Sequence, residues 1–229
     1  YTGLKQVGKD RQMKIRKLAA AAAAVGLALA IWGCSGSDGA DAADFKENCL
    51  ILKKDGSLWW ASVEDAGQGN YDQEEMLSFA REAISAYNAS KGSESTADYK
   101  KGESLPVSVV SGTIENGRAV LVTAYDDPQG LLDFSQEMGD ASMGFTELEA
   151  GTVEGLGLDF GSVDWKDTKG AAAAAQDVSK KGSALVLKTA GEGLVQTEKK
   201  IRYVSQGCEL VSEHVVRMPA EGTGCIVTE

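Results

Sequence analysis

Apolar residues flank short polar turns twice in the first half of the chain, and this pattern predicts two β-hairpins. The two turns are Asp55-Gly56 and Asn116-Gly117. Asp-Gly and Asn-Gly are favoured in tight hairpins, because these residues tolerate positive φ angles. The apolar and β-prone runs on either side are residues 49–52 with 58–63, and residues 105–114 with 118–125.

Helical spacing of apolar residues predicts two main helices between and after these hairpins. In residues 73–88 apolar side chains recur every three or four positions, as on one face of a helix. Asp72 stands before this run and Glu75 follows three residues later, as in a capping box. Asp127-Pro128 predicts the start of the second helix, since Asp favours the cap and Pro the first helical position. The five alanines at 171–175 predict a short third helix.

The C-terminal quarter returns to short β-prone runs separated by turn residues, which predicts a β-meander. The expected strands are residues 184–189, 194–197, 201–205, 209–212, 215–218 and 225–228. The fold class is therefore α+β, with antiparallel hairpins and a C-terminal meander packed with two main helices. We expect one domain over residues 45–229, with a subdivision near residues 150–170 as the alternative.

The segment from Met13 to Cys34 has the pattern of a secretory signal. Three cations, Lys14, Arg16 and Lys17, precede an uncharged run of 15 residues at 18–32. A helix of that length spans ~22 Å, which is short of the ~30 Å hydrocarbon core of a bilayer. A cleaved signal is therefore favoured over an uncleaved anchor or a buried Ala-rich helix. Residues 1–12 precede Met13 and are left out of the predicted fold.

Ile31-Trp32-Gly33-Cys34 resembles the lipobox of bacterial lipoproteins, although Trp32 stands where that family usually has a small residue. The resemblance implies cleavage between Gly33 and Cys34 and attachment of a diacylglyceryl group to the Cys34 sulfur. It also implies a bacterial protein held at the outer face of the cell membrane by its lipid. The Gly-, Ser- and Asp-rich residues 34–44 then form a flexible tether.

The charge of the predicted mature chain is strongly negative. The whole chain carries 23 Lys and Arg against 34 Asp and Glu, a net charge of −11. Residues 1–33 contain six of the cations and one Asp, so 17 cations and 33 acids remain, a net charge of −16. A surface of this charge repels the phosphates of nucleic acids, so no nucleic-acid partner is expected.

Three cysteines remain in the domain if Cys34 carries lipid. Export implies a compartment in which disulfides form. Cys208 and Cys225 fall in two predicted C-terminal strands, so this pair is the preferred disulfide among three alternatives. Cys49 would then lie outside the disulfide as a buried thiol. The spacing of Cys and His residues matches no metal site, and no cofactor is expected.

Residues 49–229 also resemble a group of uncharacterised lipoproteins from gut Firmicutes. The resemblance implies a lipid-anchored extracellular α+β domain and transfers no catalytic residue. It rests on the order of the elements and on four motifs, which are Tyr71-Asp72-Gln73-Glu74-Glu75, Tyr87-Asn88, the Asn116-Gly117 hairpin with the helix after Tyr125, and Lys200-Ile201-Arg202-Tyr203-Val204-Ser205.

Two functions fit these observations. The first is a non-enzymatic surface lipoprotein that binds an extracellular ligand or an envelope protein, with Trp59 and Trp60 as the expected contact surface. Adjacent residues of a strand point to opposite faces, so one Trp would be exposed. The second is a secreted hydrolase that uses carboxylates. Its candidates are Asp126, Asp127 and Asp164, and the single His214 is interpreted as a surface or core-edge residue.

Overall fold

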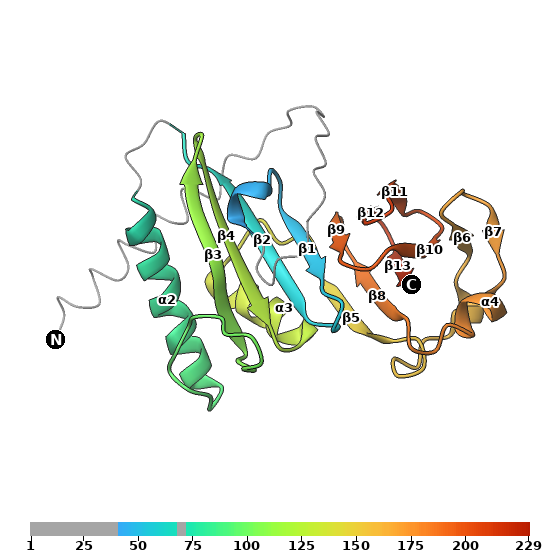
Figure 1. Cartoon of the computed structure of the whole chain (residues 1–229), viewed down its shortest axis with the longest axis horizontal. Coiled ribbons are helices and arrows are strands. Elements are labelled where there is room, and N and C mark those ends of the chain that lie inside the picture. Colours follow the sequence, from blue (N-terminus) through green and yellow to red (C-terminus); the bar gives the residue numbers. More distant parts are fainter. Residues whose placement is uncertain (1–40, 68–71) are drawn as a thin grey trace.

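The computed structural model describes residues 41–67 and 72–229 as two β-sheets with helices packed against them (Figure 1). The first sheet contains β1 (Cys49–Leu52), β2 (Leu58–Asp65), β3 (Val107–Glu115), β4 (Arg118–Tyr125), β9 (Gly193–Thr197), β11 (Glu209–Ser212) and β12 (Val215–Met218). The second contains β5 (Glu147–Thr152), β6 (Trp165–Asp167), β7 (Ala172–Ala173), β8 (Leu185–Ala190), β10 (Ile201–Ser205) and β13 (Thr223–Thr228). The helices are η1 (Ala42–Asp44), α2 (Gln73–Ser90), α3 (Pro128–Met138), η2 (Phe160–Ser162) and α4 (Ala175–Ser179).

Both predicted hairpins are present, and turn chemistry explains them. β1 pairs with β2, and β3 with β4, in antiparallel register. Asn116 and Gly117 both have positive φ angles, 52° and 75°, as a tight turn between twisted strands requires. β2 also pairs with β4 over its eight residues, so the two hairpins form one continuous sheet.

The C-terminal meander is confirmed, and its strands are shared between the two sheets. The strand orders are β11-β12-β9-β1-β2-β4-β3 and β5-β8-β13-β10-β6-β7. β9 joins the first sheet by parallel pairing with β1, from Cys49 opposite Leu194 to Leu52 opposite Thr197. β8, β10 and β13 pair antiparallel in the second sheet. The pairing of β1 with β9 therefore joins the N-terminal part of the described chain to its C-terminal part.

The two main helices form as predicted and lie against the sheets. The side chain of Asp72 accepts a hydrogen bond from the Glu75 amide at 3.0 Å, which caps α2. Asp127 caps α3 in the same way through the Gly130 amide at 2.8 Å, and Pro128 is the first helical residue. α2 packs against β3, and α3 packs mainly against β5.

The largest hydrophobic cluster joins one face of each sheet to α2 and α3. Its most enclosed members include Leu50, Leu58, Ile84, Leu131, Leu187 and Ile226. The outer face of the first sheet forms a second cluster beneath η1, with Phe45, Trp59 and Val122. The outer face of the second sheet forms a third, with Phe160, Trp165 and Val178. Each sheet is thus covered on both faces, which is why so few of its residues are exposed.

Two predicted boundaries differ from the structure. The helix expected from residues 171–175 covers only Ala175–Ser179, because Ala172 and Ala173 pair with β6 instead. Here pairing with a neighbouring strand outweighs the helical preference of alanine. The predicted tether also ends earlier, because Ala42 is buried in the second cluster and Asp41 caps η1. Within residues 41–67 and 72–229, no helix combines the length and apolarity needed to cross a bilayer.

Candidate functional site

The expected contact surface at Trp59 and Trp60 is wrong, because both side chains are buried. They point to opposite faces of β2 as predicted, yet they are only 1% and 3% exposed. The ammonium of Lys53 lies 4.0 Å above the Trp59 ring, and Tyr99 packs edge-on against the same ring. Trp60 packs against Phe145 in the central core. The two aromatic rings therefore stabilise the fold and offer no platform to a ligand.

The predicted disulfide between Cys208 and Cys225 is also wrong, since both are free thiols. Cys208 belongs to the central cluster, whereas Cys225 points from β13 into the third cluster on the other face of that sheet. Cys208 lies in the turn between β10 and β11, and two side chains on opposite sides of a sheet cannot meet without moving the backbone. Burial raises the pKa of Cys225 to about 12, with Cys208 adding to the shift, so this thiol stays protonated at neutral pH.

Asp126 and Asp127 lie together at the start of α3. The side chain of Asp127 caps the helix through the hydrogen bond from the Gly130 amide described above. Partial desolvation, followed by the neighbouring Asp127 carboxylate, raises the pKa of Asp126. The capping role of Asp127 and the closeness of the two carboxylates at the helix start explain the pair without a substrate.

Asp164 is not brought to the same place as Asp126. It is exposed just before β6, whereas α3 packs on β5. Four strand spacings separate β6 from β5 in the second sheet, a distance of ~19 Å. Paired carboxylates that hydrolyse glycosides lie ~5–10 Å apart. The structure therefore does not assemble Asp164 with the other two candidates.

His214 is a half-buried residue in the turn between β11 and β12. Its Nδ1 lies 2.9 Å from the carbonyl oxygen of Thr197, to which it must donate a hydrogen bond. Its backbone amide donates a hydrogen bond to the Ser212 hydroxyl oxygen at 3.2 Å. These contacts hold the turn against β9, so the core-edge interpretation of this residue fits its surroundings.

A polar cluster that the sequence did not indicate lies where the loop after α3 covers β2. Asp140 accepts hydrogen bonds from both the amide and the hydroxyl of Ser142, at 2.8 and 2.6 Å. The Ser142 hydroxyl also lies 3.4 Å from that of Ser62. Burial, with a contribution from Asp140, raises the pKa of Glu64. Ser62 and Glu64 are at least 76 residues away in sequence from Asp140 and Ser142, so no local motif could reveal the cluster.

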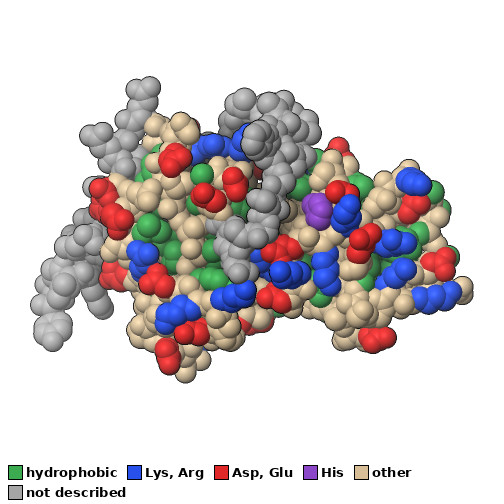
Figure 2. Space-filling view, viewed as in Figure 1, with side chains coloured by type: hydrophobic (Ala, Val, Ile, Leu, Met, Phe, Trp, Pro, Cys, Tyr) green, Lys and Arg blue, Asp and Glu red, His purple; other side chains and the backbone are tan. Residues whose placement is uncertain are grey.

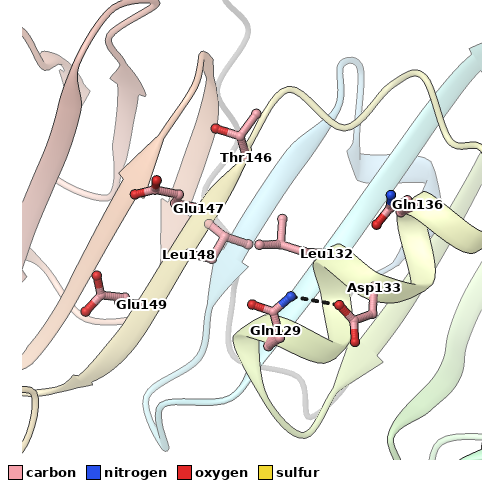
Figure 3. A pocket seen from close by; sticks show the side chains of 8 residues that line it. All are labelled: Gln129, Leu132, Asp133, Gln136, Thr146, Glu147, Leu148 and Glu149. Atoms are coloured by element: carbon pink, nitrogen blue, oxygen red, sulfur yellow. Dashed lines mark hydrogen bonds between the residues drawn. The ribbon is translucent and has the colours of Figure 1, made fainter.

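A groove of about 340 Å³ runs between α3 and β5 (Figure 3). Leu132 from the helix and Leu148 from the strand point toward one another and form its floor. The helix side also presents Gln129, Asp133 and Gln136, which share one face of α3. The strand side presents Thr146, Glu147 and Glu149. The groove thus has an apolar floor and polar walls.

The strand that forms one wall of the groove has an unpaired backbone edge. β5 is the first strand of its sheet and pairs only with β8. The Val153 amide donates to the Ala184 carbonyl at 2.9 Å, and antiparallel strands alternate such pairs with outward-facing residues. The amides and carbonyls of Leu148 and Ala150 therefore face away from β8, and they bond to no other described residue.

Carboxylates dominate the charges on the walls of the groove. Its lining residues include Asp133, Glu147 and Glu149 and no cation. Lys91 pairs with Asp133 at 3.5 Å, and Lys188 pairs with Glu149. Glu147 forms no ion pair with any described residue. Lys188 also interacts electrostatically with Glu147, so the strand side of the groove has two carboxylates for one cation.

The rest of the described surface is less suited to binding a ligand than the α3–β5 groove. A second hollow of about 500 Å³ at the end of α4 is lined by Lys180, Lys181, Glu154 and Glu229 and has no apolar floor comparable to Leu132 and Leu148. On the face shown in Figure 2, acidic and basic side chains are interspersed. Met138, at 37%, is the one large hydrophobic side chain exposed among the described residues. Among the described residues, no group of three or more Cys, His, Asp or Glu side chains is arranged to hold a metal ion.

Gly33 and Cys34, the predicted cleavage and lipidation site, lie outside the described residues. Comparison with known proteins gives no match, whether the chain is tested against family models, curated proteins or solved structures. The candidate site is therefore defined by its geometry alone. We take the α3–β5 groove as that site, because it combines a floor, polar walls and an open strand edge.

Proposed function

We propose that this chain is a bacterial surface lipoprotein whose folded domain binds an extracellular partner without catalysing a reaction. The observation that carries the proposal is the run from Met13 to Cys34, with its cations, its apolar stretch and its Gly33-Cys34 ending. Two acyl chains on one sulfur hold a protein stably at a bilayer, whereas a single chain binds only marginally.

The length of chain after Cys34 supports display close to the membrane. Asp41, which caps the first helix of the folded part, follows Cys34 by seven residues. Seven residues reach at most ~25 Å when fully extended. A domain attached in this way stays near the lipid surface, where it meets envelope proteins and secreted molecules. The net charge of −16 beyond residue 33 keeps such a domain soluble.

The α3–β5 groove supports a binding role for the domain. It is open to solvent, it presents unused backbone donors and acceptors, and it carries carboxylates on its walls. Groups of this kind recognise a partner through hydrogen bonds and charge. They do not include a nucleophile with an adjacent base, which covalent chemistry would need.

The anchor is tested by replacing Cys34. The full chain and its Cys34→Ala variant are expressed in a bacterium that processes lipoproteins, and the N-terminal peptide of each is weighed by mass spectrometry. We expect the unchanged chain to begin at Cys34 and to carry a diacylglyceryl group. The variant should keep residues 13–33 and carry no lipid. Ser37→Ala, three residues after the modified position, is the matched control and should be processed normally.

A native chain that retains residues 13–33 and has no acyl group would refute the proposed anchor. A chain that is cleaved elsewhere and released into the medium would refute it equally. Cell fractionation of the same cultures distinguishes these two results, because only the first leaves the protein associated with membranes through its apolar segment.

A further inference from the structure

The open edge of β5 can accept one more strand. Leu148, which lines the groove, and Ala150, two residues further along β5, each direct an amide and a carbonyl away from β8, and this two-residue repeat matches the hydrogen-bonding repeat of an extended partner strand. Unpaired strand edges are templates for pairing with other chains, and native proteins usually block them. Here α3 forms the opposite wall of the groove and does not pair with the edge of β5.

The side chains on either face of β5 specify the residues that such a strand would carry. Leu148 and Ala150 face the central core, whereas Glu147 and Glu149 project from the other face. In an added strand, residues on the inner face would contact Leu132 and Leu148 and would be small or apolar. Residues on the outer face would stand beside Glu147 and Glu149, where cations are favoured as cross-strand neighbours.

We propose that the α3–β5 groove binds an extended peptide segment of a partner protein, with alternating basic and apolar residues, as an additional strand on β5. This inference rests on the proposed binding function and names its partner class. Main-chain hydrogen bonds to Leu148 and Ala150 supply affinity, as in other complexes formed by strand addition. Glu147 and Glu149 supply the preference for a basic segment.

A second copy of this chain does not fit the same edge. Two β5 strands paired with each other would bring Glu147 and Glu149 of one copy beside the same residues of the other. Like charges directly opposite each other on neighbouring strands are destabilising. The acidic residues that attract a basic peptide therefore also prevent self-association through this edge.

Binding is tested with the full chain in detergent and a fluorescein-labelled peptide of alternating Lys and Val residues. Fluorescence anisotropy follows the titration, and a peptide of alternating Glu and Val residues is the charge control. We expect saturable binding of the Lys peptide and none of the Glu peptide. Hydrogen exchange of the Leu148 and Ala150 amides should slow when the Lys peptide is bound, because these groups become hydrogen-bonded.

Two variants separate strand addition from general charge attraction. Ala150→Pro removes an amide that the fold does not use, and proline is tolerated where a strand amide faces outward. It should weaken binding about tenfold or more, since a main-chain hydrogen bond is lost and the ring blocks the edge. Glu147→Lys should weaken binding about three- to tenfold by reversing a cross-strand charge. Glu82→Lys makes the same charge change on the exposed face of α2 and should leave binding unchanged.

Absence of binding at millimolar peptide would overturn the proposed partner class, and so would equal weakening by Glu82→Lys and Glu147→Lys. Undiminished binding to a folded Ala150→Pro variant would exclude strand addition. If that variant does not fold, the hydrogen exchange of Leu148 and Ala150 in the unchanged protein decides the question. These results are independent of the mass analysis at Cys34, so failure of the groove and failure of the anchor are recognised separately.

Discussion

A half-buried carboxylate, Glu64, links the stability of the fold to pH. Burial and Asp140 raise its pKa above the ordinary value of 4.5, so the folded protein binds this proton more tightly than the unfolded chain does. Stability therefore falls as pH rises from the ordinary value through the raised one. Above that range, the folded state holds an unfavourable charge.

We therefore predict that Glu64→Gln stabilises the protein at pH 7 and has little effect at pH 4. The gain should stay below about 1 kcal/mol, because the side chain keeps part of its surface in water. Thermal unfolding at both pH values measures the difference. Glu82→Gln, on the exposed face of α2, is the control. Equal stabilisation by Glu64→Gln at both pH values would mean that packing, rather than charge, explains the effect.

At the scale of residues, alternation along β2 correctly predicts that Trp59 and Trp60 face opposite sides. It does not predict that both sides are covered. The cover over Trp59 comes from Lys53 and Tyr99, and the cover over Trp60 comes from Phe145. Tyr99 and Phe145 are 40 and 85 residues away from their partners in the printed sequence, so only the tertiary fold determines burial here.

At the scale of elements, α3 depends on Asp127, the residue that caps its start. The Asp127 carboxylate satisfies one of the amides that a helix start leaves without a partner. We predict that Asp127→Ala lowers the free energy of unfolding by about 1 kcal/mol, the usual cost of losing a cap. Urea denaturation measures the change.

Asp127→Asn is the matched variant for this cap. Its amide oxygen still accepts the hydrogen bond from Gly130, and the repulsion on Asp126 is removed. It should therefore remain within a few tenths of a kcal/mol of the unchanged protein. Similar losses for the Ala and Asn variants would show that the hydrogen bond at the cap contributes little to α3.

The elements predicted correctly are those determined by local chemistry. The turn at Asn116-Gly117 and the caps at Asp72 and Asp127 depend on interactions between residues close in sequence, so a sequence pattern can predict them. The parallel pairing of β1 with β9 joins residues about 145 positions apart and has no local signature. The α3–β5 groove escaped prediction for the same reason, because the unpaired status of β5 depends on the order of the whole sheet.

At the scale of the whole molecule, the two sheets enclose thiols that the fold keeps apart. Cys208 and Cys225 are 8% and 2% exposed and lie on opposite faces of the second sheet. We predict that neither reacts with a thiol reagent in the native protein and that both react after unfolding without reductant. Mass spectrometry of alkylated peptides from the Cys34→Ala variant measures both states.

Reduction before alkylation is the control for this experiment and should not increase labelling of Cys208 or Cys225. A peptide mass that joins residues 208 and 225 in the unreduced sample would contradict the free thiols of the structure. Rapid labelling of the native protein would instead indicate that the second sheet opens locally.

The parallel contact between β1 and β9 has a consequence for the order in which the parts of the chain fold. β9, which pairs with β1 on the side away from β2, follows it in the chain by almost 150 residues. The β1–β2 hairpin therefore has no partner on that side until most of the polypeptide has been synthesised. Contacts between such distant segments form slowly, because a long loop must close first. The growing chain cannot complete its first sheet until residue 218, the end of β12, has emerged, so final closure of the molecule is a late event.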